Sequence, residues 1–109
     1  MSGLLVFCNV PDQAVADQLA AKLIEERLAA CVNILAPCRS VYCWEGKIEV
    51  GVEVPLIIKT TRRQYPELEA RIQSLHPYQV PEIIACDIDC GLPAYLTWVE
   101  DAVISRASD

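Results

Sequence analysis

Cys8 and His76 are the two residues whose types suit metal chemistry and whose positions the predicted fold should bring together. His76 is the only histidine in the chain; Pro77 follows it directly, and Pro81 lies four residues further on. Prolines remove conformations from a loop, which lowers the entropic cost of holding a side chain in place. A thiolate and an imidazole together suit a soft or late transition metal, copper foremost. Cys8 and His76 are therefore candidate ligands of a copper ion.

Other interpretations of this pair stay open. A histidine in a stiff loop can instead cap a helix or hydrogen-bond to the backbone, with Cys8 as a small buried thiol. Two ligands are also fewer than the four that structural zinc takes. A nucleophile–base pair is a weaker alternative, because no third residue that would orient the base and no oxyanion element is evident. We therefore expect a protein that is not an enzyme.

The chain has six cysteines in 109 residues, a number that invites a disulfide interpretation. We expect free thiols instead, because no secretory signal is present and most of the cysteines fall in apolar, strand-like runs. There is no C-x-x-C spacing of the kind found in zinc fingers and redox sites. Cys86 and Cys90 would share one face of a strand at about 13 Å, too far apart to bind one metal ion.

Composition and charge narrow the class of protein. Hydrophobic residues make up 53% of the chain and charged residues 22%, so we expect one globular domain over residues 1–109. The formal net charge is −6 and the basic residues are scattered, which argues against a nucleic-acid partner. No apolar run approaches the roughly 20 residues of a membrane helix, so we expect no membrane partner.

Hydrophobic periodicity predicts alternating strands and helices. The expected strands cover residues 4–10, an extended region 31–60 broken by a turn at 44–47, and 82–90; the expected helices run from about 12 to 27, over 64–75 and over 93–106. This order predicts an α+β fold, a ferredoxin-like βαββαβ sandwich with an antiparallel sheet, a long central hairpin and a C-terminal helix. Its first and last strands are adjacent, which brings Cys8 toward His76.

The predicted hairpin is too long for a domain of this size. A strand of about 14 residues spans about 46 Å, whereas a compact chain of this length has a radius of gyration of about 13 Å. A two-residue turn at Glu45–Gly46 would place Pro37 and Pro55 at the same level of the hairpin. Proline cannot donate a ladder hydrogen bond, so we expect a bulge or an edge at that level.

Apolar side chains lie on both faces of the projecting part of this hairpin, which we call the arm. One face carries Val41, Cys43, Ile48, Val50 and Val52, and the other carries Tyr42 and Trp44. Left in water, such an arm would be prone to aggregation. We expect a neighbouring subunit to cover it; the alternative is an arm that folds back on its own sheet.

Six segments of the chain resemble the CutA family of divalent-cation tolerance proteins. They are FCNVPD, RLAACVNI, SVYCWEGKIE, EVPLIIKTT, HPYQVPEII and YLTWVEDA, in the family's order. The resemblance implies a ferredoxin-like homotrimer with interlocked hairpins, located in the cytoplasm and associated with tolerance of copper and other heavy metals. In copper-binding members the ligands are a cysteine in C-x-x-P-D and histidines before P-Y, which correspond here to Cys8 and His76. Leu75 stands where a further histidine can precede His76, so one ligand of that pattern is absent.

A second functional hypothesis is a trimeric small-ligand sensor or signalling adaptor, similar in architecture to the nitrogen-regulatory signal proteins, with metal tolerance as an indirect effect. Its ligand would bind in clefts between subunits near Lys59 and Glu53. Lys59, Arg62 and Arg63 also surround a strand-to-helix junction that could hold an anion, although a solvated helix start is the favoured interpretation.

Overall fold

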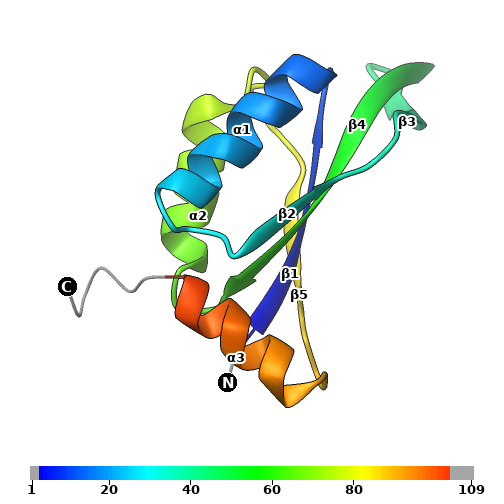
Figure 1. Ribbon diagram of the computed structural model, residues 1–109. Coiled ribbons are helices and arrows are strands. Elements are labelled where there is room, and N and C mark those ends of the chain that lie inside the picture. Colours follow the sequence, from blue (N-terminus) through cyan, green and yellow to red (C-terminus); the bar gives the residue numbers. More distant parts are fainter. Residues whose placement is uncertain (1–2, 104–109) are drawn as a thin grey trace.

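One antiparallel sheet organises the chain, and its elements follow the predicted order (Figure 1). The computed structural model describes residues 3–103. Its elements are β1 (Gly3–Val10), α1 (Gln13–Glu25), β2 (Cys31–Ile34), β3 (Cys38–Trp44), β4 (Lys47–Thr61), α2 (Tyr65–Leu75), β5 (Ile83–Asp87) and α3 (Pro93–Ala102). The predicted ferredoxin-like α+β fold is confirmed. The expected last turn of the C-terminal helix, residues 104–106, lies outside the described residues.

The first and last strands of the sheet are neighbours, as the topology predicts. The strand order is β2-β4-β1-β5, and β3 pairs with the outer half of β4. Cys8 of β1 lies opposite Ile83 of β5 on one side and opposite Leu56 of β4 on the other. The end of β1 therefore lies beside the beginning of β5, at the edge of the loop that contains His76.

The core lies between the sheet and the helices α1 and α2, which cover the same face in Figure 1. Most buried sheet residues are even-numbered: Leu4, Val6, Cys8 and Val10 of β1, and Val54, Leu56, Ile58 and Thr60 of β4; Gly3 and Thr61, at the ends of the two strands, are buried as well. The odd-numbered residues of β1 from Leu5 onward point to the opposite face and are only partly buried. Helices α1 and α2 lie on one face of the sheet, so the opposite face of β1 is only partly covered within a single chain.

The ends of α1 follow from local chemistry. Asp12 caps its start, since the carboxylate accepts a hydrogen bond of 2.9 Å from the Val15 N–H. The helix ends slightly earlier than predicted, because Arg27 has a φ of 59° and so lies in the left-handed region that terminates helices. The Arg27 guanidinium then donates to the carbonyls of Asp101 and Ala102 at the end of α3, which ties α3 to the body.

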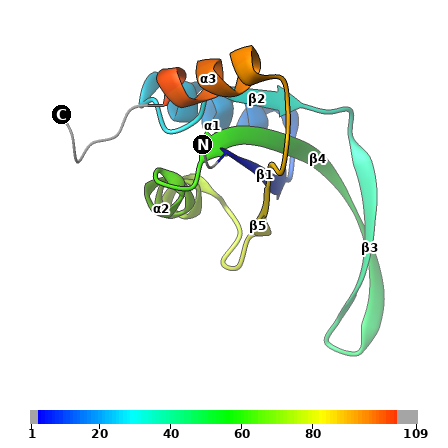
Figure 2. The same cartoon turned by 90° about the horizontal axis from the view of Figure 1, so that it is seen from below.

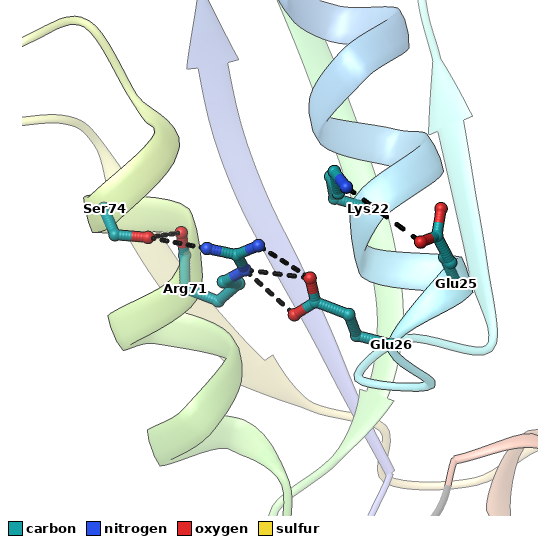
Figure 3. Close-up of polar contacts among 5 residues, drawn as sticks. All are labelled: Lys22, Glu25, Glu26, Arg71 and Ser74. Carbon is teal, nitrogen blue, oxygen red and sulfur yellow. Dashed lines mark hydrogen bonds and ion pairs between the residues drawn. The ribbon is translucent and has the colours of Figure 1, made fainter.

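A bidentate ion pair connects α1 to α2 (Figure 3). Arg71 Nε lies 2.9 Å from Oε1 of Glu26, and Arg71 Nη2 lies 2.7 Å from its Oε2. The hydrogen bonds that Arg71 donates to Glu26 raise the pKa of Arg71. Ser74 lies on the other side of the guanidinium, whereas Lys22 and Glu25 form a looser surface pair at 4.0 Å. The paired guanidinium and carboxylate hold the two core-covering helices in one relative position.

The arm consists of β3 and residues 47–53 of β4, joined by the predicted two-residue turn. Trp44 pairs with Lys47, and the turn residues Glu45 and Gly46 have φ values of 50° and 78°. Positive φ at both positions is the geometry that matches the twist of a hairpin. The predicted register and turn are confirmed.

A bulge separates β2 from β3, at the level of the two prolines. Ile34 pairs with Leu56, and Cys38 pairs with Glu53. Residues 35–37 therefore lie opposite only Val54 and Pro55. The one extra residue is the irregularity expected where proline interrupts a ladder.

The arm projects away from the rest of the fold and does not fold back on its own sheet (Figure 2). The molecule measures 46 × 27 × 22 Å with a radius of gyration of 14.7 Å, larger than the roughly 13 Å of a compact chain of this length. The predicted interface side chains are exposed: Tyr42, Trp44, Ile48, Val50 and Val52. A subunit that covers them stays a prediction.

Candidate functional site

Cys8 and His76 meet at one backbone atom, the carbonyl oxygen of Asn9. His76 Nε2 lies 2.7 Å from this oxygen, and Cys8 Sγ lies 3.9 Å from it. The prediction that the fold brings these two residues together is confirmed. Their roles as metal ligands are a separate question, which depends on the state of each donor atom.

Different elements position the two side chains. Cys8 lies near the end of β1 and points toward the helices, so it is fully buried. His76 is the C-cap of α2, and its N–H donates a 2.9 Å hydrogen bond to the carbonyl of Ile72. The backbone of His76 is already extended, as expected for a residue before Pro77. The end of the helix therefore fixes where the imidazole enters the site.

Both ring nitrogens of His76 are engaged. A carbonyl oxygen can only accept a hydrogen bond, so the Nε2 atom that faces Asn9 must carry the proton. The Nδ1 atom then has a lone pair, and it accepts a 3.1 Å hydrogen bond from the N–H of Tyr78. The ring of Tyr78 packs against the imidazole at a centroid distance of 4.7 Å. This geometry is that of a hydrogen-bonded loop histidine, the interpretation left open by the sequence.

The thiol of Cys8 is held in its protonated form. Burial raises its pKa from 9.0 to about 12, and the negative charges of Glu82 and Glu53 add to the effect. Metal coordination requires the thiolate. At neutral pH this side chain is therefore a small apolar group of the core.

Cys8 and His76 could bind a copper ion only after each donor atom had been freed, at a cost in free energy. The rise in pKa to about 12 makes the Cys8 thiolate harder to form by on the order of 4 kcal/mol. Freeing His76 would leave the Asn9 carbonyl or the Tyr78 N–H without its partner, at about 1–3 kcal/mol each. Within residues 3–103, no group of three or more histidine, cysteine or acidic side chains is arranged to hold a metal ion.

Asn9 is a site residue that the sequence interpretation missed. Its carbonyl accepts from His76, and its side-chain Nδ2 donates a 3.3 Å hydrogen bond to Glu82 Oε1. One residue thus holds both ends of the loop 76–82. The sequence did contain a signal for Asn9: it follows Cys8 directly and lies near the end of a central strand, just before the proline-containing start of a helix.

Tyr78 is the second missed residue, and it extends the site to the arm. Its hydroxyl donates a 3.2 Å hydrogen bond to Glu53 Oε2 on β4. Burial raises the pKa of Tyr78, with further contributions from Glu53, Tyr42 and Asp12. The tyrosine in the P-Y pair was visible in the sequence, but its partner across the fold was not.

Lys59 and Glu53, the residues predicted near a subunit cleft, do not lie together in one chain. Both are on β4, six positions apart in sequence, which corresponds to about 20 Å along a strand. Lys59 donates to Asn33 Oδ1 on β2, and Glu53 accepts from Tyr78. A cleft that uses both residues would require a second subunit.

The remaining candidate residues are the other cysteines and the basic residues at the strand-to-helix junction. All six cysteines are free thiols, as expected. β5 ends at Asp87, so Cys90 lies beyond the strand rather than on it, because the chain leaves the sheet before α3. Arg62 of the candidate anion site is paired with the carboxylate of Asp87.

The part of the chain that the structure describes, residues 3–103, contains no helix with the length and apolar character needed for a membrane span.

Comparison with known proteins places this chain and its fold in a family. Residues 4–102 match the CutA1 divalent ion tolerance protein family. The divalent-cation tolerance protein CutA of Thermus thermophilus is 44% identical over 97 residues, which are 89% of this chain and 94% of that protein. CutA1 from Oryza sativa has a TM-score of 0.95 at 38% identity, with 97% of each chain covered. The periplasmic divalent cation tolerance protein CutA from Archaeoglobus fulgidus has a TM-score of 0.90 at 35% identity, covering 94% of this chain and 99% of its own. The chain described here belongs to the CutA1 family of divalent ion tolerance proteins.

Proposed function

We propose that this protein acts in divalent-cation tolerance as a cytoplasmic homotrimer that binds a metal ion and catalyses no reaction. The observation that carries the assembly is the arm. Its side chains Ile48, Val50 and Val52 are 79%, 60% and 64% exposed, and they form one apolar face with Val41 and Cys43. A surface of this kind is stable in water when another subunit covers it.

The test of the assembly is the mass in solution. Light scattering should give about three times the 12.1 kDa chain mass. A folded monomer at micromolar concentration would contradict the proposal, because the arm would then be stable without a partner.

We propose copper, or another heavy-metal ion, as the ligand, with Cys8 and His76 as its donors. The support is their shared position at Asn9 O together with the family's association with divalent cations. Both donors are engaged in the arrangement described, so the proposal is one of weak binding. The free energy needed to free the two donors reduces the free energy of metal binding, and each 1.4 kcal/mol lowers the affinity about tenfold.

Calorimetry under reducing conditions tests the donors. Cys8→Ala and His76→Ala should each weaken copper binding by about tenfold or more. Leu75→His should strengthen it, because Leu75 is partly exposed and an imidazole there would not have to leave a hydrogen bond first. Affinity that is indifferent to all three changes would exclude these donors and leave the indirect form of metal tolerance.

The small-ligand sensor remains the alternative function. It needs Lys59 and Glu53 from different subunits, because the two residues lie far apart on one strand. Co-purification of an anion or metabolite at a subunit boundary would favour it over metal binding.

A further inference from the structure

Four residues form a continuous chain of contacts from the end of β1 to the base of the arm. The Asn9 carbonyl accepts from His76 Nε2 at 2.7 Å, His76 Nδ1 accepts from the Tyr78 N–H at 3.1 Å, and the Tyr78 hydroxyl donates to Glu53 at 3.2 Å. We propose that Tyr78 is a positioning residue: oriented by His76, its phenol fixes the base of the arm to the body of the fold.

His76 orients Tyr78 in two ways. The imidazole holds the backbone of Tyr78 through Nδ1, and its ring packs against the phenol ring with an interplanar angle of 51°. Because His76 is itself bound to Asn9, the phenol is anchored to the central strand of the sheet. The hydroxyl is then the part of Tyr78 left to reach outward, and it reaches Glu53.

The bond to Glu53 falls where the backbone ladder is weakest. Glu53 and Cys38 form the first pair of the arm beyond the bulge, and Pro37 and Pro55 of the bulge have no N–H to donate. An interrupted ladder restrains the direction of the arm less than a continuous one. A side-chain hydrogen bond at this level supplies a restraint that the backbone lacks.

This role requires no metal ion, and it uses the ring nitrogens of His76 in the hydrogen bonds they already make. It goes beyond the proposed function, since it concerns how the arm is aimed rather than what the protein binds. A subunit that grips the arm would meet it in a fixed direction, which lowers the entropy lost on association.

Hydrogen exchange, followed by mass spectrometry, measures the restraint. Tyr78→Phe removes only the hydroxyl, and amides of residues 38–53 should then exchange about three- to tenfold faster, the range expected for one hydrogen bond. Amides of α2 should be unchanged. Tyr65→Phe is the matched control, because Tyr65 donates a 2.8 Å hydrogen bond to Glu69 within α2, away from the arm; its arm amides should exchange as in the native protein.

Variants of Glu53, which accepts the hydrogen bond from Tyr78, distinguish an effect on the position of the arm from a general loss of stability. Glu53→Gln keeps an oxygen for Tyr78 and should leave arm exchange nearly native, whereas Glu53→Ala should match Tyr78→Phe. The double variant Tyr78→Phe/Glu53→Ala should be no faster than either single one, since the same bond is lost once.

Two results would overturn the proposal. One is native exchange in the arm of Tyr78→Phe; the other is faster exchange in α2 and the arm alike, which would indicate a general loss of stability. The mass of each variant, measured alongside, reports on the trimer separately, so a failure of the assembly proposal is distinguishable from a failure of this one.

Discussion

The Nε2 atom of His76 lies 2.7 Å from the carbonyl oxygen of Asn9, and this contact fixes which nitrogen of the ring carries the proton. The carbonyl has no hydrogen to give, so the imidazole must donate. The other nitrogen is then the acceptor that the N–H of Tyr78 requires. With both ring nitrogens hydrogen-bonded, His76 joins its loop to the end of β1 through contacts within the chain.

The tautomer of His76 is directly measurable, because no other histidine is present. Nitrogen NMR of the uniformly labelled protein, at a pH where the ring is neutral, should show a protonated Nε2 and an unprotonated Nδ1. Shifts averaged between the two nitrogens, or the opposite tautomer, would contradict the geometry at Asn9.

Removing the imidazole should lower the stability of the fold. His76→Ala leaves the Asn9 carbonyl and the Tyr78 N–H without partners, and we expect the free energy of unfolding to fall by about 2 kcal/mol. His76→Gln should lose less, because its side-chain amide has both a donor group (NH2) and an acceptor (the carbonyl oxygen). Urea unfolding of both variants checks this order; an alanine variant as stable as the native protein would show that water replaces the ring without cost.

Stability should fall at alkaline pH because of Cys8. Its thiol has a pKa of 9.0 unfolded and about 12 folded, so only the unfolded chain loses this proton as the pH rises from 9. The contribution is fully present below pH 9 and is lost progressively toward pH 12, in total on the order of 4 kcal/mol.

Urea unfolding between pH 8 and about 11 measures how steeply the free energy of unfolding falls with pH. This slope should be flatter in Cys8→Ala, even though the variant starts from lower stability. Cys90→Ala is the matched control, because it removes an exposed thiol. Tyr65, whose pKa burial and Glu69 raise to about 12, contributes in the same direction, so Tyr65→Phe should be measured in parallel. A slope identical in Cys8→Ala and the native protein would count against a buried, protonated thiol.

A charge on the apolar face of the arm should prevent self-association. In Val50→Glu the new carboxylate would be buried without a partner in any assembly that covers this face. Light scattering should then give about one third of the native mass, with the far-ultraviolet circular dichroism unchanged. Gln73→Glu adds the same charge to the exposed surface of α2 and should leave the mass native. A native mass for Val50→Glu would show that the face is not an interface.

The sequence predicted those parts of the structure that follow from periodicity and topology. Alternating side chains and a turn with Gly46 set the register of the arm, and two prolines at one level marked the bulge. The adjacency of the first and last strands placed Cys8 near His76 before any distance was known. Each of these features depends on spacing along the chain.

The details of the site depend instead on contacts between distant segments. That Asn9 would offer its backbone oxygen to His76 follows from the rotamer of the imidazole and the exact end of α2, neither of which periodicity predicts. The bond between Tyr78 and Glu53 joins a loop to an arm whose direction the sequence leaves open.

Because of the extra residue in the bulge, β2 and β3 pair with β4 in registers that differ by one residue. In β2, odd-numbered Asn33 lies opposite odd-numbered Ile57; in β3, odd-numbered Val41 lies opposite even-numbered Val50. Deleting one residue of 35–37 would leave two residues opposite Val54 and Pro55, so β2 and β3 would both keep their present pairing with β4. The extra residue therefore does not decide which β2 side chains enter the core; it bends and twists the chain at the base of the arm, so its removal should change the direction in which the arm leaves the sheet.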